Sequence, residues 1–216
     1  MSTQKINIPK LGIFLGLLAA LAAGLLSVVK AATEEAIAIN LQKKTDAALQ
    51  QVLPAFDQVT PVTLRSEQDW SVKYYVAKQG DKVVGFAGEV ITPEGFSGDV
   101  TVMAGLNLDG SVRTVIVTAN TETPGLGTAV TDRKVKKTIV DLLSGGGKKE
   151  GLAPNPFLDQ YAKRKAETTT WKVTKDGGDV DGKTGATITS RAVCGAVYAI
   201  AKTAADHLEE LVKGAE

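Results

Sequence analysis

The sequence has very little of the two residue types that most often bind transition metals: it contains one cysteine, Cys194, and one histidine, His207. A single cysteine cannot form a disulfide within the chain, and the pair is too small for a zinc site, an iron–sulfur site or a Cys–His catalytic pair. A Ser–His–Asp triad would have to use His207, which lies late in a helical pattern where a solvent-exposed histidine is the ordinary case. We therefore predict no metal site and assign no catalytic residue, and any electron chemistry requires an organic cofactor.

The chain also lacks an excess of charge of either sign. Twenty-five Lys and Arg residues stand against 24 Asp and Glu residues, which gives a net charge of +1. Without a basic field there is no argument for nucleic-acid binding. Apolar residues make up 44% of the 216 residues, which is enough for a buried core and too much for a disordered chain.

One long stretch lacks charge altogether. Residues 11–29 read LGIFLGLLAALAAGLLSVV, and about 20 apolar residues at about 1.5 Å each cross a hydrocarbon core of about 30 Å. The pattern therefore predicts a single transmembrane helix. Lys5 and Lys10 precede it and Glu34 and Glu35 follow it, which favours a cytoplasmic N-terminus and places the rest of the chain on the periplasmic or extracellular side of the cytoplasmic membrane.

A cleaved signal peptide is the competing interpretation of this stretch. The sequence around Ala31 loosely fits a small-residue cleavage site. However, the apolar run is longer than the roughly 7–15 residues of a usual signal-peptide core, which favours an uncleaved anchor. Both interpretations export the remainder of the chain.

The chain is expected to have three parts: a cytoplasmic N-terminus and transmembrane anchor (1–31), a helical stalk (32–54) that stops at Pro54, and an exported domain (55–216). Segments rich in Val, Tyr, Ile and Thr then run from residue 72 to 119, separated by turn sequences at 79–81, 93–98 and 108–110, and predict an antiparallel meander of about four strands. A helix is expected over 131–143, beginning at Thr131 or Asp132, followed by a loop over 144–151. A long C-terminal helix is expected over 188–213. Strands grouped before helices indicate an α+β domain.

A cluster of hydroxyl-bearing residues precedes the C-terminal helix, in the stretch DGKTGATITS at 181–190. The first N–H groups of a helix lack partners and its dipole is positive there, so a phosphate would be stabilised at this position. Gly185 and Ala186 are small enough to let a bulky group approach the backbone. Thr189 and Ser190 are expected to cap the helix.

The segment Asp181-Gly182-Lys183-Thr184-Gly185-Ala186-Thr187 resembles the Asp-x-x-(Ser/Thr)-Gly-Ala-Thr flavinylation motif of FMN-binding domains. These domains occur in the G subunit of the Rnf electron-transport complex and in the C subunit of the Na⁺-translocating NADH:quinone reductase. The resemblance implies that Thr187 carries one covalent FMN through a phosphoester bond, made by an exported flavin transferase that uses FAD as donor. It also implies that the transferase and the phosphate are recognised by the rest of the motif: Asp181, Lys183, Thr184, Gly185 and Ala186.

A second segment strengthens the resemblance, because FMN-binding domains have the sequence Glu-Thr-Pro-Gly-(Leu/Ile)-Gly next to the flavin. Pro124-Gly125 imposes a tight turn, and Leu126 offers an apolar surface suited to an isoalloxazine ring. The resemblance extends over essentially the whole chain and implies six further cofactor-binding residues: Glu122, Thr123, Pro124, Gly125, Leu126 and Gly127.

Together these features predict a membrane-anchored electron carrier within an Rnf-type oxidoreductase (a translocase). The resemblance implies electron transfer from ferredoxin to NAD⁺ coupled to Na⁺ or H⁺ translocation. The predicted span contains no ionisable residue, so the ion pathway would belong to partner subunits. Three alternatives remain: the C subunit of the quinone reductase, which is usually longer than 216 residues; an exported flavoprotein outside these complexes; and an anchored binding or scaffold module without redox chemistry.

Overall fold

The computed structural model describes residues 8–133 and 152–213, and the chain divides into two units, residues 1–44 and 45–216. Helix α1 (Ile8–Val52) fills the described part of the first unit and supplies the first residues of the second. Its most apolar 18-residue window has a mean hydropathy of 2.4 and no buried residue. Its 45 residues are about 68 Å long at 1.5 Å per residue. By length and composition this helix can cross a membrane, as the sequence predicts.

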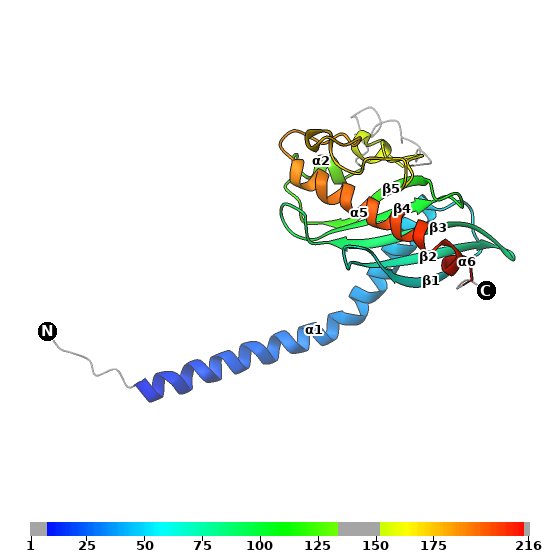
Figure 1. Cartoon of the computed structure of the whole chain (residues 1–216). Coiled ribbons are helices and arrows are strands. Elements are labelled where there is room, and N and C mark those ends of the chain that lie inside the picture. Colours follow the sequence, from blue (N-terminus) through cyan, green and yellow to red (C-terminus); the bar gives the residue numbers. More distant parts are fainter. Residues whose placement is uncertain (1–7, 134–151, 214–216) are drawn as a thin grey trace, which may run out of the picture. The chain divides into compact units, whose positions relative to one another are not determined.

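The second unit is built on a five-stranded antiparallel sheet with the strands in chain order (Figure 1). The predicted turns at 79–81, 93–98 and 108–110 lie between strands, and Gly80 and Gly110 adopt positive φ angles of 59° and 77° in two of them. The strands are Gln58–Arg65 (β1), Ser71–Gln79 (β2), Lys82–Thr92 (β3), Val100–Leu106 (β4) and Val112–Asn120 (β5).

Strand β1 is absent from the sequence prediction, and its composition explains why. It contains Pro61 and its burial pattern is weak. A proline is tolerated in a sheet when it lies on an edge strand, and β1 is the first strand in the sheet order. The meander therefore has one more strand than the sequence indicated.

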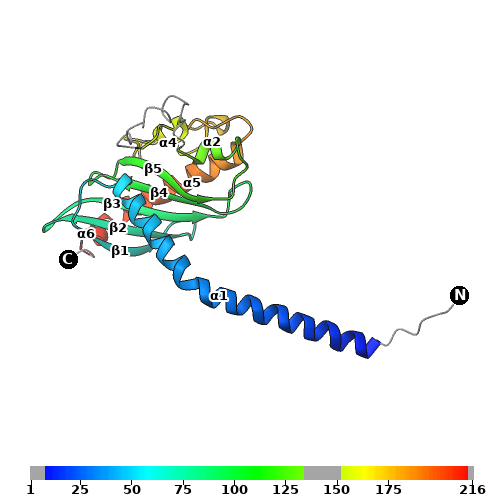
Figure 2. The ribbon, with the colours of Figure 1, turned by 180° about the vertical axis from the view of Figure 1, so that it is seen from behind.

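Both faces of the sheet are buried. One face packs against helix α5 (Thr187–Asp206) and carries alternate strand residues such as Tyr74 and Phe86. The opposite face carries their chain neighbours, including Tyr75 and Met103, and packs against the end of α1 and the residue after it: Ala48, Leu49, Val52 and Leu53. Figure 2 shows the last turns of α1 on this second face. The alternation of side chains along a strand produces the two clusters.

Helix α5 approaches the sheet closely at β3. A Cβ atom added to Gly88 would lie 2.4 Å from Ile200 Cγ2, so only a glycine permits this contact. From the neighbouring strand, the Tyr74 hydroxyl donates a 2.6 Å hydrogen bond to the Ile200 carbonyl. This packing fixes α5, and with it the residues at its N-terminus.

The C-terminal helix differs in detail from the prediction. α5 starts at Thr187, one residue earlier than expected, and ends at Asp206, and a second helix, α6, spans Leu208–Lys213. His207 separates them with a non-helical backbone (φ −119°, ψ 24°). Its exposed ring lies 3.0 Å from a Glu210 carboxylate oxygen. The apolar spacing of the sequence continues through His207, so it does not indicate this break in the helix.

Three short helices complete the described part: α2 (Thr128–Thr131), α4 (Pro156–Asp159) and the 3-10 turn η1 (Thr174–Asp176). The sequence predicts a helix beginning at Thr131 or Asp132, but Thr131 is the last residue of α2 and Asp132 follows it. The remainder of that predicted helix, and the loop predicted over 144–151, lie outside the described residues.

Candidate functional site

The two sequence segments singled out above meet at one pocket. It has a volume of about 360 Å³, within the roughly 300–1,000 Å³ typical of small-molecule sites. One wall follows the end of β5 and the other is the start of α5. The pocket is lined by Phe96, Glu122, Thr123, Leu126, Gly127, Lys175, Gly185, Ala186, Thr187, Ile188 and Thr189.

The N-terminus of α5 forms the polar side of the pocket. Ala186 is the N-cap residue and provides no side-chain hydrogen bond to the helix. The first helical bond runs from the Ser190 N–H to the Ala186 carbonyl, at 3.0 Å. The N–H groups of residues 187–189 therefore have no acceptor within the helix, and the positive end of the helix dipole points into the pocket. The backbone favours an anionic group here.

The hydroxyls of the motif have different surroundings. Ser190 Oγ accepts a 3.1 Å hydrogen bond from the Lys183 N–H and donates a 2.9 Å bond to the Ala186 carbonyl. It thus ties the preceding loop to the helix instead of accepting a bond from a first-turn N–H group. Thr187 is half-buried and lines the pocket, and its hydroxyl has no hydrogen bond to any residue that the structure describes. Within the described part of the chain, the Thr187 hydroxyl is therefore free to bond to a ligand in the pocket.

A glycine brings the two walls together. Gly185 has a φ angle of +84°, in the left-handed region that glycine adopts readily. A Cβ atom at this position would lie 3.5 Å from Leu126 Cδ2, so the two segments are in van der Waals range. Leu126 and Ile188 are 48% and 46% exposed, and together they provide apolar surface at the pocket.

The segment after β5 forms the tight turn that the sequence predicts. The Leu126 N–H donates to the Thr123 carbonyl at 3.2 Å across Pro124-Gly125. Gly125 has a φ angle of +80°, as a type II turn requires at its third position. The Thr128 hydroxyl accepts a 2.9 Å bond from the Gly125 N–H. The turn is thereby joined to the start of α2.

Glu122 is the most unusual polar group at the pocket. It is 5% exposed, and its Oε1 accepts a 2.8 Å hydrogen bond from the Phe96 N–H. Its Oε2 is the one buried side-chain oxygen or nitrogen without a hydrogen-bond partner in the described residues. A Cβ atom at Gly127 would lie 2.3 Å from Oε2, so the space around the carboxylate exists only because residue 127 is a glycine. An unpartnered buried acceptor beside a pocket fits a ligand that donates a hydrogen bond.

Of the twelve cofactor-binding residues expected from the sequence, seven line the pocket: Glu122, Thr123, Leu126, Gly127, Gly185, Ala186 and Thr187. The other five flank it in the chain without lining it: Pro124, Gly125, Asp181, Lys183 and Thr184.

Sequence reasoning missed four lining residues. Phe96, 64% exposed, comes from the loop between β3 and β4, and Lys175 comes from η1. Both reach the pocket through the tertiary fold, and no local pattern marks either of them. Ile188 and Thr189 simply continue the motif into α5. Among residues 8–133 and 152–213, no cluster of three or more His, Cys, Asp or Glu residues could hold a metal ion.

Comparisons with known proteins find relatives for both parts of the chain. Residues 95–202 match the FMN-binding domain family, and residues 1–52 match the family described as the RnfG N-terminal region. Curated relatives include proteins named as the G subunit of an ion-translocating oxidoreductase complex. The Escherichia coli (strain K12) protein is 35% identical over 201 residues, covering 88% of each chain. The Yersinia pestis protein is 35% identical over 208 residues, covering 93% of this chain and 90% of that protein. The Vibrio vulnificus (strain YJ016) protein is 30% identical over 213 residues, covering 95% and 93%.

Proposed function

The chain belongs to the family of G subunits of ion-translocating oxidoreductase complexes, with its FMN-binding domain, and on this basis we propose that it is a membrane-anchored electron carrier with one FMN esterified to Thr187. The observation that carries the proposal is the convergence of two distant segments on one pocket. That pocket combines a helix N-terminus with two groups that have no hydrogen bond to any described residue: a threonine hydroxyl and a buried carboxylate oxygen.

The pocket residues fit the three chemical parts of FMN. The N–H groups of residues 187–189 and the Lys175 ammonium, which lines the same pocket, favour the negative charge of a phosphodiester. Leu126, Ile188 and Phe96 supply apolar surface for the isoalloxazine ring. Glu122 Oε2 is an acceptor for an N–H of the ring or a hydroxyl of the ribityl chain. The Glu122 Oε2 atom and the Thr187 hydroxyl have no hydrogen-bond partner among the described residues.

Attachment requires the Thr187 oxygen to lose its proton and form a new bond to the FMN phosphorus. When FAD is the donor, the bond between its two phosphates breaks and AMP leaves with the proton from Thr187. The reaction needs no oxidant. The flavin transferase would catalyse this step outside the cytoplasm. Bound FMN would supply reversible electron uptake and release, while this chain binds it and orients its phosphate.

Within the complex, α1 would anchor the chain in the cytoplasmic membrane with its N-terminus inside and the FMN-binding domain outside. We propose an Rnf-type complex that couples ferredoxin:NAD⁺ electron transfer to Na⁺ or H⁺ translocation. Partner subunits would supply the ion pathway, because the apolar stretch of α1 contains no ionisable side chain. Its small residues, such as Gly16 and Ala20, allow partner helices to approach.

The test is to produce the full chain with and without a flavin transferase and to analyse it under denaturing conditions. With the transferase, we expect flavin fluorescence in the denaturing gel and a mass increase equal to FMN minus one water. Thr187→Val, which keeps the size of the side chain and removes the hydroxyl, should abolish both signals. Thr174→Val, an exposed threonine of η1 outside the pocket lining, is the matched control and should keep them.

Two results would contradict the proposal. Flavin that stays attached to Thr187→Val would refute the choice of residue. A wild-type chain that never acquires flavin, although the transferase modifies another substrate in the same cells, would refute the covalent cofactor and favour a binding or scaffold module. Intact mass also tests whether the N-terminal segment is retained.

A further inference from the structure

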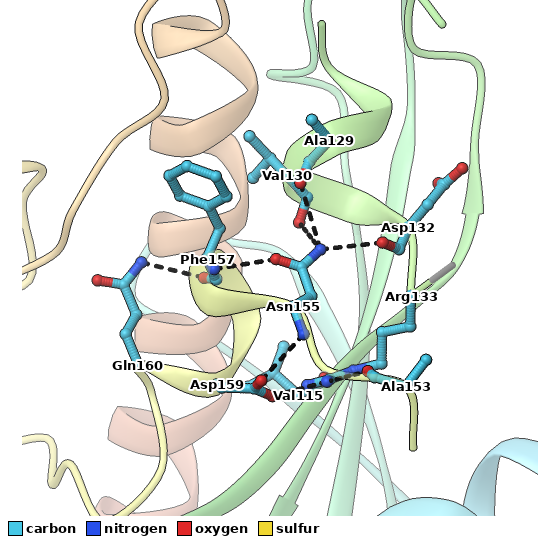
Figure 3. A network of polar contacts seen from close by, with 10 residues as sticks. All are labelled: Val115, Ala129, Val130, Asp132, Arg133, Ala153, Asn155, Phe157, Asp159 and Gln160. Atoms are coloured by element: carbon cyan, nitrogen blue, oxygen red, sulfur yellow. Dashed lines mark hydrogen bonds and ion pairs between the residues drawn. The ribbon is translucent and has the colours of Figure 1, made fainter. Parts of the chain in front are cut away.

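The two cap residues of helix α4 contact the chain next to each pocket segment: one contacts α2, which follows Gly127, and the other contacts Asp181, four residues before Gly185. Asn155 is the N-cap residue of α4 and Gln160 is its C-cap residue. Figure 3 shows both side chains with the contacts of Asn155 to the α2 region. Neither residue lines the pocket.

The Asn155 side chain holds the α2 side. It is 4% exposed, and its Nδ2 lies 3.3 Å from the Ala129 and Val130 carbonyls and 3.0 Å from the Asp132 carbonyl. Its Oδ1 accepts a 2.9 Å bond from the Phe157 N–H, in the first turn of α4. One buried amide therefore joins the start of α4 to the C-terminal carbonyls of α2, the helix that directly follows the Glu122–Gly127 turn.

The Gln160 side chain holds the α5 side. Its Oε1 accepts a 2.6 Å bond from the Asp181 N–H, and its Nε2 donates a 2.9 Å bond to the Asp181 carbonyl. A side-chain amide thus pairs with a peptide group as a neighbouring strand would. Asp181 is the first residue of the motif that ends at Thr187. This contact therefore holds the backbone at the start of the motif in place.

Helix α4 is itself attached to the sheet. Leu158 is fully buried in the core beneath it. Arg133, with a side chain only 8% exposed, donates to the Val115 carbonyl of β5 and to the Asp159 carboxylate at 2.6 Å. Lys163 and Arg164 exchange backbone hydrogen bonds of 2.7 and 2.8 Å with Val112. The helix whose cap residues contact α2 and Asp181 is therefore fixed to β5.

We infer that α4 sets the separation of the two pocket walls, with Asn155 and Gln160 as positioning residues for the FMN site. The inference rests on the proposed function, because it concerns the flavin attached at Thr187. Neither side chain contacts the cofactor in this proposal. Each acts through the backbone segment that it holds: Asn155 through α2 and Gln160 through Asp181.

The test uses the full flavinylated chain in detergent and compares Gln160→Met and Asn155→Ala with wild type. Gln160→Met keeps the length of the side chain and removes both bonds to Asp181. Asn107→Ala is the matched control, because Asn107 donates one side-chain amide bond of 2.9 Å to Ser111 in the turn that begins β5, at the opposite end of that strand from Glu122. Intact mass first establishes that each protein carries FMN.

In Gln160→Met and Asn155→Ala we expect a shifted FMN midpoint potential, a lower flavin fluorescence anisotropy and a changed visible circular dichroism band. The control should lose some stability and keep all three flavin properties at their wild-type values. If both site variants lose stability but keep the wild-type flavin properties, the positioning role is refuted. Because Gln160 is only half-buried, Gln160→Met keeps the test decisive if Asn155→Ala does not fold. Absence of FMN from the wild-type chain would refute the proposed function instead.

Discussion

Replacing Glu122 by glutamine separates the two roles that the structure gives this residue. The substitution keeps the shape and the acceptor for the Phe96 N–H, which lies 2.8 Å from Oε1. It replaces Oε2, which is buried without a partner among the described residues, by a neutral NH₂ group. The charge is removed, and an acceptor at the pocket becomes a donor.

The expected effect has opposite signs with and without flavin. A buried unsatisfied polar atom costs about 1–3 kcal/mol, and more when it is charged. The neutral amide should therefore stabilise the flavin-free chain by about 1–2 kcal/mol, which corresponds to about 2–8 °C in Tm for a domain of this size. With FMN attached, a hydrogen bond from the cofactor to a charged acceptor, worth about 1.5–3 kcal/mol, is lost. The glutamine variant should then be the less stable protein.

The assay is denaturant unfolding of the full chain, produced with and without the transferase and followed by far-ultraviolet circular dichroism. Glu94→Gln, at an exposed carboxylate near the same loop, is the control and should change neither form. Glu122→Ala should destabilise both forms because it also removes the acceptor for Phe96. If Glu122→Gln destabilises the flavin-free chain as much as Glu122→Ala does, Oε2 has a partner and the reasoning is wrong.

Three further predictions concern other contacts. Gly88→Ala should destabilise the domain by about 1–3 kcal/mol in denaturant unfolding, because its Cβ atom would lie 2.4 Å from Ile200 Cγ2; an unchanged midpoint would contradict the close helix–sheet contact. Burial raises the pKa of the Cys194 thiol to about 12. Iodoacetamide at pH 8.5 should therefore label this thiol only after unfolding, and rapid labelling of the native chain would refute this. Because the folded chain favours the protonated thiol, the free energy of unfolding should fall as the pH rises above the ordinary pKa of 9.0. Lys175→Met should make FMN reduction less favourable by about 1 kcal/mol or less, and salt should weaken this effect. Lys183 lies outside the pocket lining, so Lys183→Met should shift the midpoint potential less. The reverse order in a potentiometric titration would assign the phosphate contact to Lys183.

Much of the fold could be predicted because its signals are local. Alternating apolar residues and glycine turns mark β2 to β5, and a continuous apolar run marks the first part of α1. Strand β1 was missed because Pro61 is acceptable only at a sheet edge, and edge position is a property of the assembled sheet. The break at His207 was missed because apolar spacing continues across it.

The site was predicted in part for the same reason. The two motifs are contiguous in sequence, and Thr187 at the helix start follows from them. The contribution of Phe96 and Lys175 depends on which loops the sheet brings together. Asn155 before Pro156 is a recognisable helix start, but the carbonyl groups that its Nδ2 contacts lie 23–26 residues earlier in the chain. No local pattern indicates that this helix cap also contacts α2, next to the candidate site.

The packing of the last turns of α1 has a practical consequence for cutting the chain. Leu49, Val52 and Leu53 belong to the core on one face of the sheet. The contact is close, because a Cβ atom added to Gly105 would lie only 2.1 Å from the Val52 carbonyl oxygen. A water-soluble fragment that starts at residue 55 would leave Met103 and its neighbours on that face bare. A fragment that starts at about residue 45, the beginning of the second unit, removes the apolar run and keeps that face covered. The second compact unit thus begins before α1, the helix that precedes it in the chain, has ended.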